Sequence, residues 1–145
     1  MLFSYNADLL PRLRMTGHIR YSQPWIHFAR RLDEYVLYVI REGNMYLREN
    51  ELEYHLKAGD FFLLEPGLQH AGTKKASCDY FYAHFTHPEL RRVDDEAAAM
   101  AELAEKRRQS LISYNLDAAD PTDSLTYLPK HFHLSGCLLY TSDAA

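Results

Sequence analysis

The side chains best suited to bind a small polar molecule stand on one predicted strand, residues 80–85. Because side chains alternate along a strand, one face carries Tyr80, Tyr82 and His84, and the other carries Phe81, Ala83 and Phe85. The first set combines aromatic area with hydrogen-bonding tips, so we expect it to line a wet cavity. The second set is interpreted as ordinary core.

His70 is a second candidate, because the twelve-residue stretch before it has a readable structure. Gly59 and Asp60 predict a tight turn that tolerates positive φ, and the apolar run 61–64 is too short for a helix. Pro66 and Gly67 then end that strand. This turn, strand and turn would place one imidazole at a fixed point in a β-barrel wall. Both a buried structural histidine and a pocket-lining one stay open.

Other residues that could do chemistry carry weaker signals. His131 and His133 would share one face of a strand, but no carboxylate is nearby in the sequence, so we interpret them as surface or packing histidines. Cys78 and Cys137 form no CxxC pair or disulfide framework. The residues alone therefore indicate neither a metal nor another cofactor.

Composition limits the fold and the partners. A chain of 145 residues with 47% hydrophobic content can build one core. Its net charge of -4 argues against an extended nucleic-acid surface. No apolar run is long enough to span a membrane, and residues 1–14 lack the apolar region of a signal peptide, so we expect a cytoplasmic protein.

The elements that must position these side chains are mostly short strands. Turn signals at 22–24, 42–44 and 49–51 separate β-type segments, which predicts an antiparallel sandwich or barrel. The segment 35–41 is predicted to be central and buried on both sides. A helix is expected from about Asp95 to Ser110, and Pro129 should limit the strand-like segment 124–134 to an edge strand or an interrupted strand. The expected strands are 15–21, 25–31, 35–41, 45–48, 52–56, 61–64, 71–75 and 80–85.

The last residues, 137–145, continue none of these patterns. They look like a sequencing adapter translated in frame, so we expect the natural sequence to stop at Gly136. The predicted organisation is an N-terminal arm at 1–14, one domain at 15–136 with a helix near 95–110, and a non-native tail at 137–145. The arm would either cover one barrel end or respond to a bound ligand.

Three signatures together resemble the sensor domain of AraC-type transcriptional regulators. The apolar strand from Tyr35 runs to a hairpin glycine at Gly43, the unit Gly59 to His70 resembles the second cupin motif with Pro66 before its second glycine, and 80–85 resembles an aromatic strand ending in His-Phe. The resemblance implies a cupin-like barrel, a double-stranded β-helix or jelly-roll, with an added helix after the main strands.

The resemblance also implies a site. Tyr80 and Tyr82 correspond to ligand-contacting positions, and Arg30 or Arg31 falls where a ligand-binding arginine would stand. We prefer Arg30, in phase with Phe28 and Ile26, although a solvent-facing arginine is the competing interpretation. The predicted ligand-binding residues are therefore Arg30, His70, Tyr80 and Tyr82.

A metal is not expected at this site. Cupin enzymes hold a metal with a His-x-His pair, a glutamate and a later histidine; here these positions fall on Ala29, Arg31, Val36 and His70. One imidazole does not hold a divalent ion against water. The sequence therefore favours a sensor of a small polar or sugar-like molecule, with no cofactor and no enzymatic activity.

The partners implied are the effector and, in a full-length regulator, DNA and a second copy of the chain, because no helix-turn-helix is visible here. The alternative is a metal-dependent cupin enzyme, such as an isomerase or dioxygenase, which would need three protein ligands.

Overall fold

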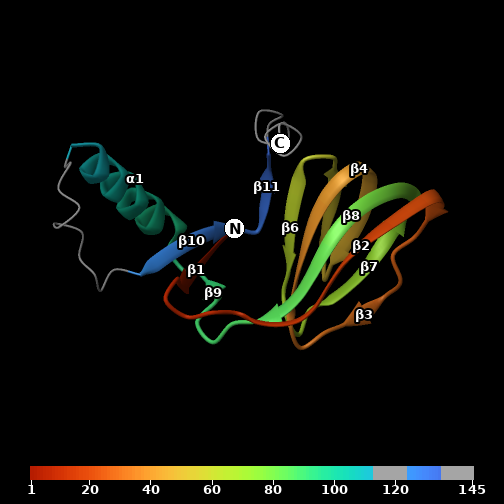
Figure 1. Cartoon of the computed structure of the whole chain (residues 1–145), viewed down its shortest axis with the longest axis horizontal. Helices are drawn as coiled ribbons and strands as arrows, with labels where there is room; N and C mark the ends of the chain where they lie inside the picture. The colour runs from red at the N-terminus through yellow and green to blue at the C-terminus, as the bar shows by residue number, and fades with distance from the viewer. Residues whose placement is uncertain (113–123, 135–145) are drawn as a thin grey trace, which may run out of the picture. The chain divides into compact units, whose positions relative to one another are not determined.

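The computed structural model describes residues 1–112 and 124–134, so Asp117, Pro121 and the tail at 137–145 lie outside the described residues. The chain divides into two compact units (Figure 1). The smaller unit contains Met1–Leu10 and His87–Pro129, and the larger contains Pro11–Thr86 and the segment from Lys130 onward. No helix in the described ranges is long and apolar enough to cross a membrane.

The smaller unit contains one antiparallel sheet, in which the first strand of the chain pairs with two strands that lie far from it in sequence. Strand β1 (Leu2–Asn6) lies between β10 (Leu125–Pro129) and β9 (Arg91–Arg92). Phe3 of β1 is fully buried. The sequence did not predict this strand within 1–14, because its partners lie at the far end of the chain.

Helix α1 (Glu96–Ile112) belongs to the same unit and matches the predicted helix closely. The Asp95 carboxylate accepts a hydrogen bond from the backbone N–H of Ala98 at 2.9 Å, which caps the first turn. The exposed Met100 and Leu103 agree with the thin apolar stripe of this helix.

The larger unit is built around one long strand, β4 (Tyr35–Glu49). The first half of β4 pairs with β6 (Asp60–Leu64) and β8 (Ala76–Thr86), and its second half pairs with β5 (Leu52–Lys57) and β7 (Gln69–Lys74). Every pairing is antiparallel (Figure 1). The remaining strands of this unit are β2 (Arg12–Trp25) on β8, β3 (Arg30–Arg31) on β7 and β11 (His131–His133) on β6.

Alternation along β4 places its core residues. Val36, Tyr38 and Ile40 are buried and pack with Leu47 and Phe62, whereas the residues between them on β4 are half-buried. The central position predicted for this segment is confirmed, but its outer face is only partly covered. The predicted mostly β fold with one added helix is confirmed.

The predicted hairpin at 42–44 is wrong. Gly43 has a φ of 78°, but β4 continues through it, and a register shift against β8 falls between Ile40 and Glu42. The bulge thus lies at Arg41, and Gly43 is the last residue of β4 paired with β8 before the pairing with β5 begins at Asn44. A β-bulge bends the strand that carries it, and the two halves of β4 pair with different neighbours.

The predicted turn at 22–24 is also wrong, because β2 runs through it to Trp25 with a register shift after Tyr21. The expected second strand, 25–31, shrinks to β3. The turns at Asn50, Gly59 and Gly67 are confirmed, with φ values of 49°, 90° and 77°. β10 ends at Pro129, at the edge of its described sheet, and β11 begins two residues later at His131, as the missing N–H of proline predicts.

Candidate functional site

A cavity of about 120 Å³ lies inside the larger unit. Aromatic rings make up most of its wall, and Arg30 contributes the positive charge. Its lining residues are Met15, Ile19, Tyr21, Trp25, His27, Phe28, Arg30, Tyr38, Tyr80, Tyr82 and His84.

Strand β3 brings Arg30 to this cavity. Arg30 stands directly opposite His70 in the β3–β7 pairing, so their side chains share one face, and the Arg30 Nε–H donates to His70 Nε2 at 3.2 Å. Arg31 is opposite Gln69 and is exposed. The structure thus places Arg30, rather than Arg31, at the cavity. The assumed strand phase with Ile26 and Phe28 is wrong, because both side chains are exposed in a segment without strand pairing.

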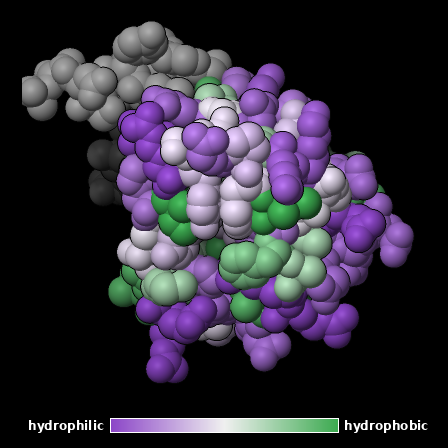
Figure 2. Space-filling view, turned by 90° about the vertical axis from the view of Figure 1, so that its right-hand side faces the viewer, coloured by the Kyte–Doolittle hydropathy of each residue, from purple (hydrophilic) through white to green (hydrophobic). Residues whose placement is uncertain are grey.

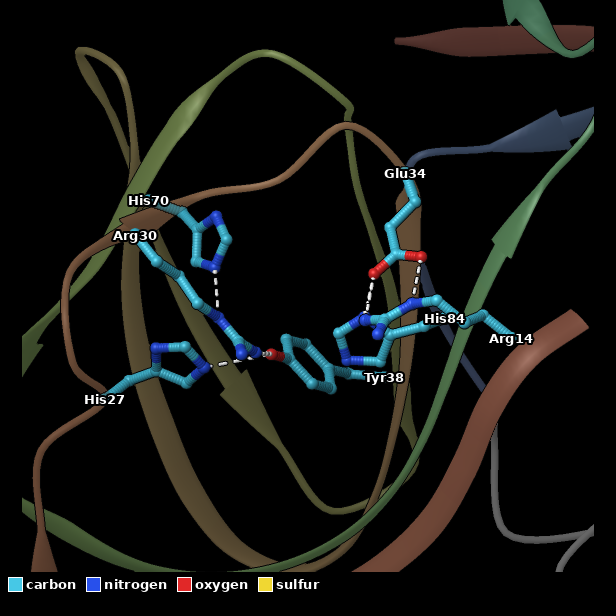
Figure 3. A network of polar contacts seen from close by, with 7 residues as sticks. All are labelled: Arg14, His27, Arg30, Glu34, Tyr38, His70 and His84. Carbon is cyan, nitrogen blue, oxygen red and sulfur yellow. Dashed lines mark hydrogen bonds and ion pairs between the residues drawn. The ribbon is translucent and has the colours of Figure 1, made fainter.

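Tyr38 and His27 extend the contacts of Arg30 into a network (Figure 3). Arg30 Nη2 donates to the Tyr38 hydroxyl at 3.5 Å, and this hydroxyl lies 2.9 Å from His27 Nε2. His27 Nδ1 lies 2.9 Å from the carbonyl oxygen of Phe28. A carbonyl only accepts, so Nδ1 carries the proton, and His27 Nε2 must accept from Tyr38.

The local backbone explains how His27 reaches this position. The N–H of Gly72 on β7 donates to the His27 carbonyl at 2.8 Å, and a Cβ on Gly72 would lie 2.6 Å from the His27 backbone nitrogen. Only glycine permits this close approach. The sequence pattern did not single out His27, because the segment around it has no strand periodicity.

Both imidazoles are neutral at physiological pH. Burial lowers the pKa of His27 to about 4, and burial with the charge on Arg30 nearby lowers the pKa of His70 to about 4. His70 is 1% exposed and is not among the residues that line the cavity. It contacts the cavity lining through its hydrogen bond with Arg30. The structure thus favours the buried, hydrogen-bonded interpretation of His70.

The aromatic strand lies as its alternation predicts. Tyr80, Tyr82 and His84 all line the cavity, and the Tyr80 ring meets the Tyr38 ring edge-on at 5.4 Å. The residue opposite Tyr82 on β2 is Gly17. A Cβ at Gly17 would lie 2.5 Å from the Tyr82 hydroxyl, so only glycine leaves room for the tyrosine ring there. The structure brings Arg30, Tyr80 and Tyr82 to one cavity; their role in binding stays a prediction.

His84 also joins a second set of charged contacts. Its Nδ1 lies 2.7 Å from Glu34 Oε1, and Arg14 forms an ion pair with the same carboxylate (Figure 3). The hydrogen bond from Arg14, more than that from His84, holds the pKa of Glu34 below its usual value. Glu34 and His84 are buried, whereas the Arg14 side chain is 58% exposed, so these contacts link the cavity wall to the surface.

The outer face of β8 differs from the prediction. Phe81 was expected in the core but is 45% exposed, and it lines an open groove of about 490 Å³ with Leu37, Val39 and Ala83. The groove is larger than the cavity, but its lining residues, unlike those of the cavity, include no arginine. On the side of the molecule shown in Figure 2, hydrophobic patches are separated by hydrophilic side chains. The smaller cavity is therefore the better candidate site.

The residues present do not fit a cupin metal. Within the parts of the chain that the structure describes, no three His, Cys, Asp or Glu side chains are grouped to hold an ion. His70, which matches one cupin ligand position, already accepts from Arg30 at 3.2 Å, and the positive guanidinium there opposes a cation.

The interpretation of His131 and His133 needs one correction. Asp60, a 2% exposed residue far away in sequence, lies 2.7 Å from His133 Nδ1 and 3.3 Å from His131 Nε2. The Asp60 carboxylate also accepts from the Lys57 N–H at 2.8 Å. The histidines therefore anchor β11 to the turn before β6.

Comparison with known protein families identifies one match that covers most of the chain. The AraC-like ligand binding domain family matches residues 14–118. An uncharacterized HTH-type transcriptional regulator of Bacillus subtilis, YisR, is 34% identical over 61 residues, which cover 41% of this chain and 21% of that protein. The match thus spans about a fifth of the length of this curated relative.

Two solved structures are more distant. A cupin protein from Bacteroides fragilis has a TM-score of 0.40 and 13% identity, covering 54% of this chain and 68% of that chain. A variant of Bacillus subtilis oxalate decarboxylase has a TM-score of 0.44 and 11% identity, covering 99% of this chain and 44% of that chain. The sequence match carries the assignment instead: the protein belongs to the AraC-like ligand binding domain family, as its three signatures indicated.

Proposed function

We propose that this chain is the effector-sensing domain of a transcription regulator and that its cavity binds a small polar molecule without transforming it. The observation that carries this proposal is the hydrogen-bonded set of Arg30, Tyr38 and His27 at an aromatic cavity. Directional donors among apolar walls are typical of small-molecule sites.

The buried contacts beside the cavity suggest how effector binding could be transmitted to the surface of the domain. His84 lines the cavity and contacts Glu34, which pairs with the exposed Arg14 at the start of β2. An effector that moves His84 would change the stability of the Glu34–Arg14 pair. Effector binding would then shift the population of conformations of the segment before β2.

The other partners of the proposed regulator lie outside this chain. With a net charge of -4, the chain itself is poorly suited to bind DNA. We therefore assign DNA binding to a further part of a full-length cytoplasmic regulator. Formation of a homodimer by that regulator is part of the same proposal and rests on the family resemblance. The competing metal-dependent enzyme would need a ligand set that Ala29, Arg31 and Val36 do not supply.

Trp25 allows a direct test, because it is the one tryptophan of the chain and lines the cavity. Its fluorescence should change saturably when a binding compound is added from a panel of sugars, polyols, amides and organic acids. Ile19→Phe, which fills the cavity, should abolish that change. Leu37→Phe, on the outer groove, should leave it intact.

Two results would contradict the proposal. One is binding that survives Ile19→Phe, which would locate the ligand elsewhere. The other is stoichiometric iron, manganese, nickel or zinc in purified protein together with turnover of a bound compound.

A further inference from the structure

We infer that the effector is a small organic monocarboxylate, held by the guanidinium of Arg30. This inference rests on the proposed function, since it names the chemical class of the molecule that the cavity would take. It follows from the charges, the donors and the size of the cavity.

Arg30 is the one permanently charged side chain among the residues that line the cavity. Within residues 1–112 and 124–134, no carboxylate forms an ion pair with it, whereas Arg14 pairs with Glu34 and both Arg20 and Arg41 lie near Asp79. A half-buried cation without a counter-ion is costly. A bound anion would remove that cost.

The donors of Arg30 are already oriented. His70 accepts from Nε, Tyr38 accepts from Nη2, and the guanidinium lies 5.0 Å from the centre of the Phe28 ring. A guanidinium has five N–H donors, so these contacts fix its plane and leave further donors for a ligand. A planar carboxylate matches this fork with two parallel hydrogen bonds.

The surroundings favour a single negative charge. His27 and His70 are neutral because burial lowers the pKa of each to about 4, so neither adds a positive charge to that of Arg30 at neutral pH. The third histidine at the cavity, His84, already contacts the Glu34 carboxylate. A phosphate group carries roughly -1.5 to -2 and would lack a second cation. Sugars carry no charge and would leave Arg30 unpaired.

The cavity also limits the body of the ligand. Its 120 Å³ corresponds to the liquid volume of about four water molecules, which suits a small acid and not a nucleotide. The stacked rings of Tyr21 and Trp25, 4.2 Å apart, and the rings of Tyr80 and Tyr82 offer apolar surface beside the arginine. We therefore expect a short or flat apolar body next to the carboxylate.

The experiment compares acids with matched amides on the whole chain. Benzoate and benzamide, butyrate and butyramide, inorganic phosphate and glucose are titrated by calorimetry and by Trp25 fluorescence. At least one acid should bind about ten-fold or more tightly than its amide. Arg30→Gln should remove that difference, and Arg31→Gln, an exposed neighbour, should keep it.

Each other outcome decides something. Amides binding as tightly as their acids would overturn the carboxylate while leaving the proposed function standing, provided that Ile19→Phe blocks them. Tighter binding of phosphate would overturn the single-charge argument. If nothing in the panel changes Trp25 fluorescence, both proposals fail. If Arg30→Gln does not fold, Arg30→Lys is used instead, because it keeps the positive charge but not the planar guanidinium. The preference for the acid over its amide should then be weaker than in the unaltered chain.

Discussion

At the scale of single residues, Tyr38 holds the polar network together, because its hydroxyl accepts from Arg30 and donates to His27. Tyr38→Phe leaves the buried His27 Nε2 without its donor. We expect the free energy of unfolding to fall by about 1–3 kcal/mol in urea denaturation. Tyr46→Phe, on the same strand but outside the network, is the control and should change it by less than about 0.5 kcal/mol. Equal effects of the two substitutions would contradict the network.

The same residues predict a dependence of stability on pH. The pKa values of His27 and His70 are about 4 in the folded chain, against an ordinary value of 6.5. Between these values the unfolded chain binds more protons, so the free energy of unfolding should decrease as the pH falls from 6.5 to 4. Each histidine contributes up to about 3 kcal/mol. The matching measurement is an NMR titration, in which imidazole signals of His27 or His70 titrating near 6.5 would refute this explanation.

At the scale of elements, the bulge in β4 predicts different costs for two glycines. Gly43 and Gly67 have nearly the same φ, 78° and 77°. A Cβ on Gly43 would overlap the Ser77 carbonyl oxygen, whereas a Cβ on Gly67 would meet nothing within 4 Å. Gly67→Ala should cost about 1–2 kcal/mol from backbone strain alone. Gly43→Ala should cost about 1–3 kcal/mol more in urea unfolding, and equal costs would show that β4 does not bend there.

These glycines also show how far local sequence predicts the elements. Gly59 and Gly67 stand in turns as predicted, because the strand between them is short and apolar. Gly43 gives the same local signal, but its pairing with Cys78 of β8 keeps the chain in one strand, and this long-range contact decides against a hairpin. The same holds for the cavity. Strand alternation correctly predicted that Tyr80 and Tyr82 share a face, whereas the position of His27 depends on a hydrogen bond with Gly72 on β7, which the local sequence does not indicate. Contacts between segments far apart in the sequence are therefore the part of the structure that the sequence pattern does not predict.

At the scale of the molecule, the chain crosses between its two units three times, after Leu10, after Thr86 and after Pro129. The last crossing ends on Lys130, which is 2% exposed. Its Nζ lies 2.5 Å from Glu49 Oε2 and 2.6 Å from Glu65 Oε1, and the Glu65 N–H donates to Glu49 at 2.8 Å. One ammonium group therefore joins the end of β4 to the turn after β6 and holds the final segment in the larger unit.

Lys130→Met tests this role, because it leaves two carboxylates together without their cation. We expect the larger unit, followed by Trp25 fluorescence in urea, to lose about 3–5 kcal/mol. Arg108→Met removes an exposed helical pair with Glu105 and should cost less than about 1 kcal/mol. Neutralising both partners as well, with Glu49→Gln and Glu65→Gln, should restore part of the loss. A small effect of Lys130→Met would mean that backbone pairing of β11 with β6, and not the buried ion pairs, fixes the last segment.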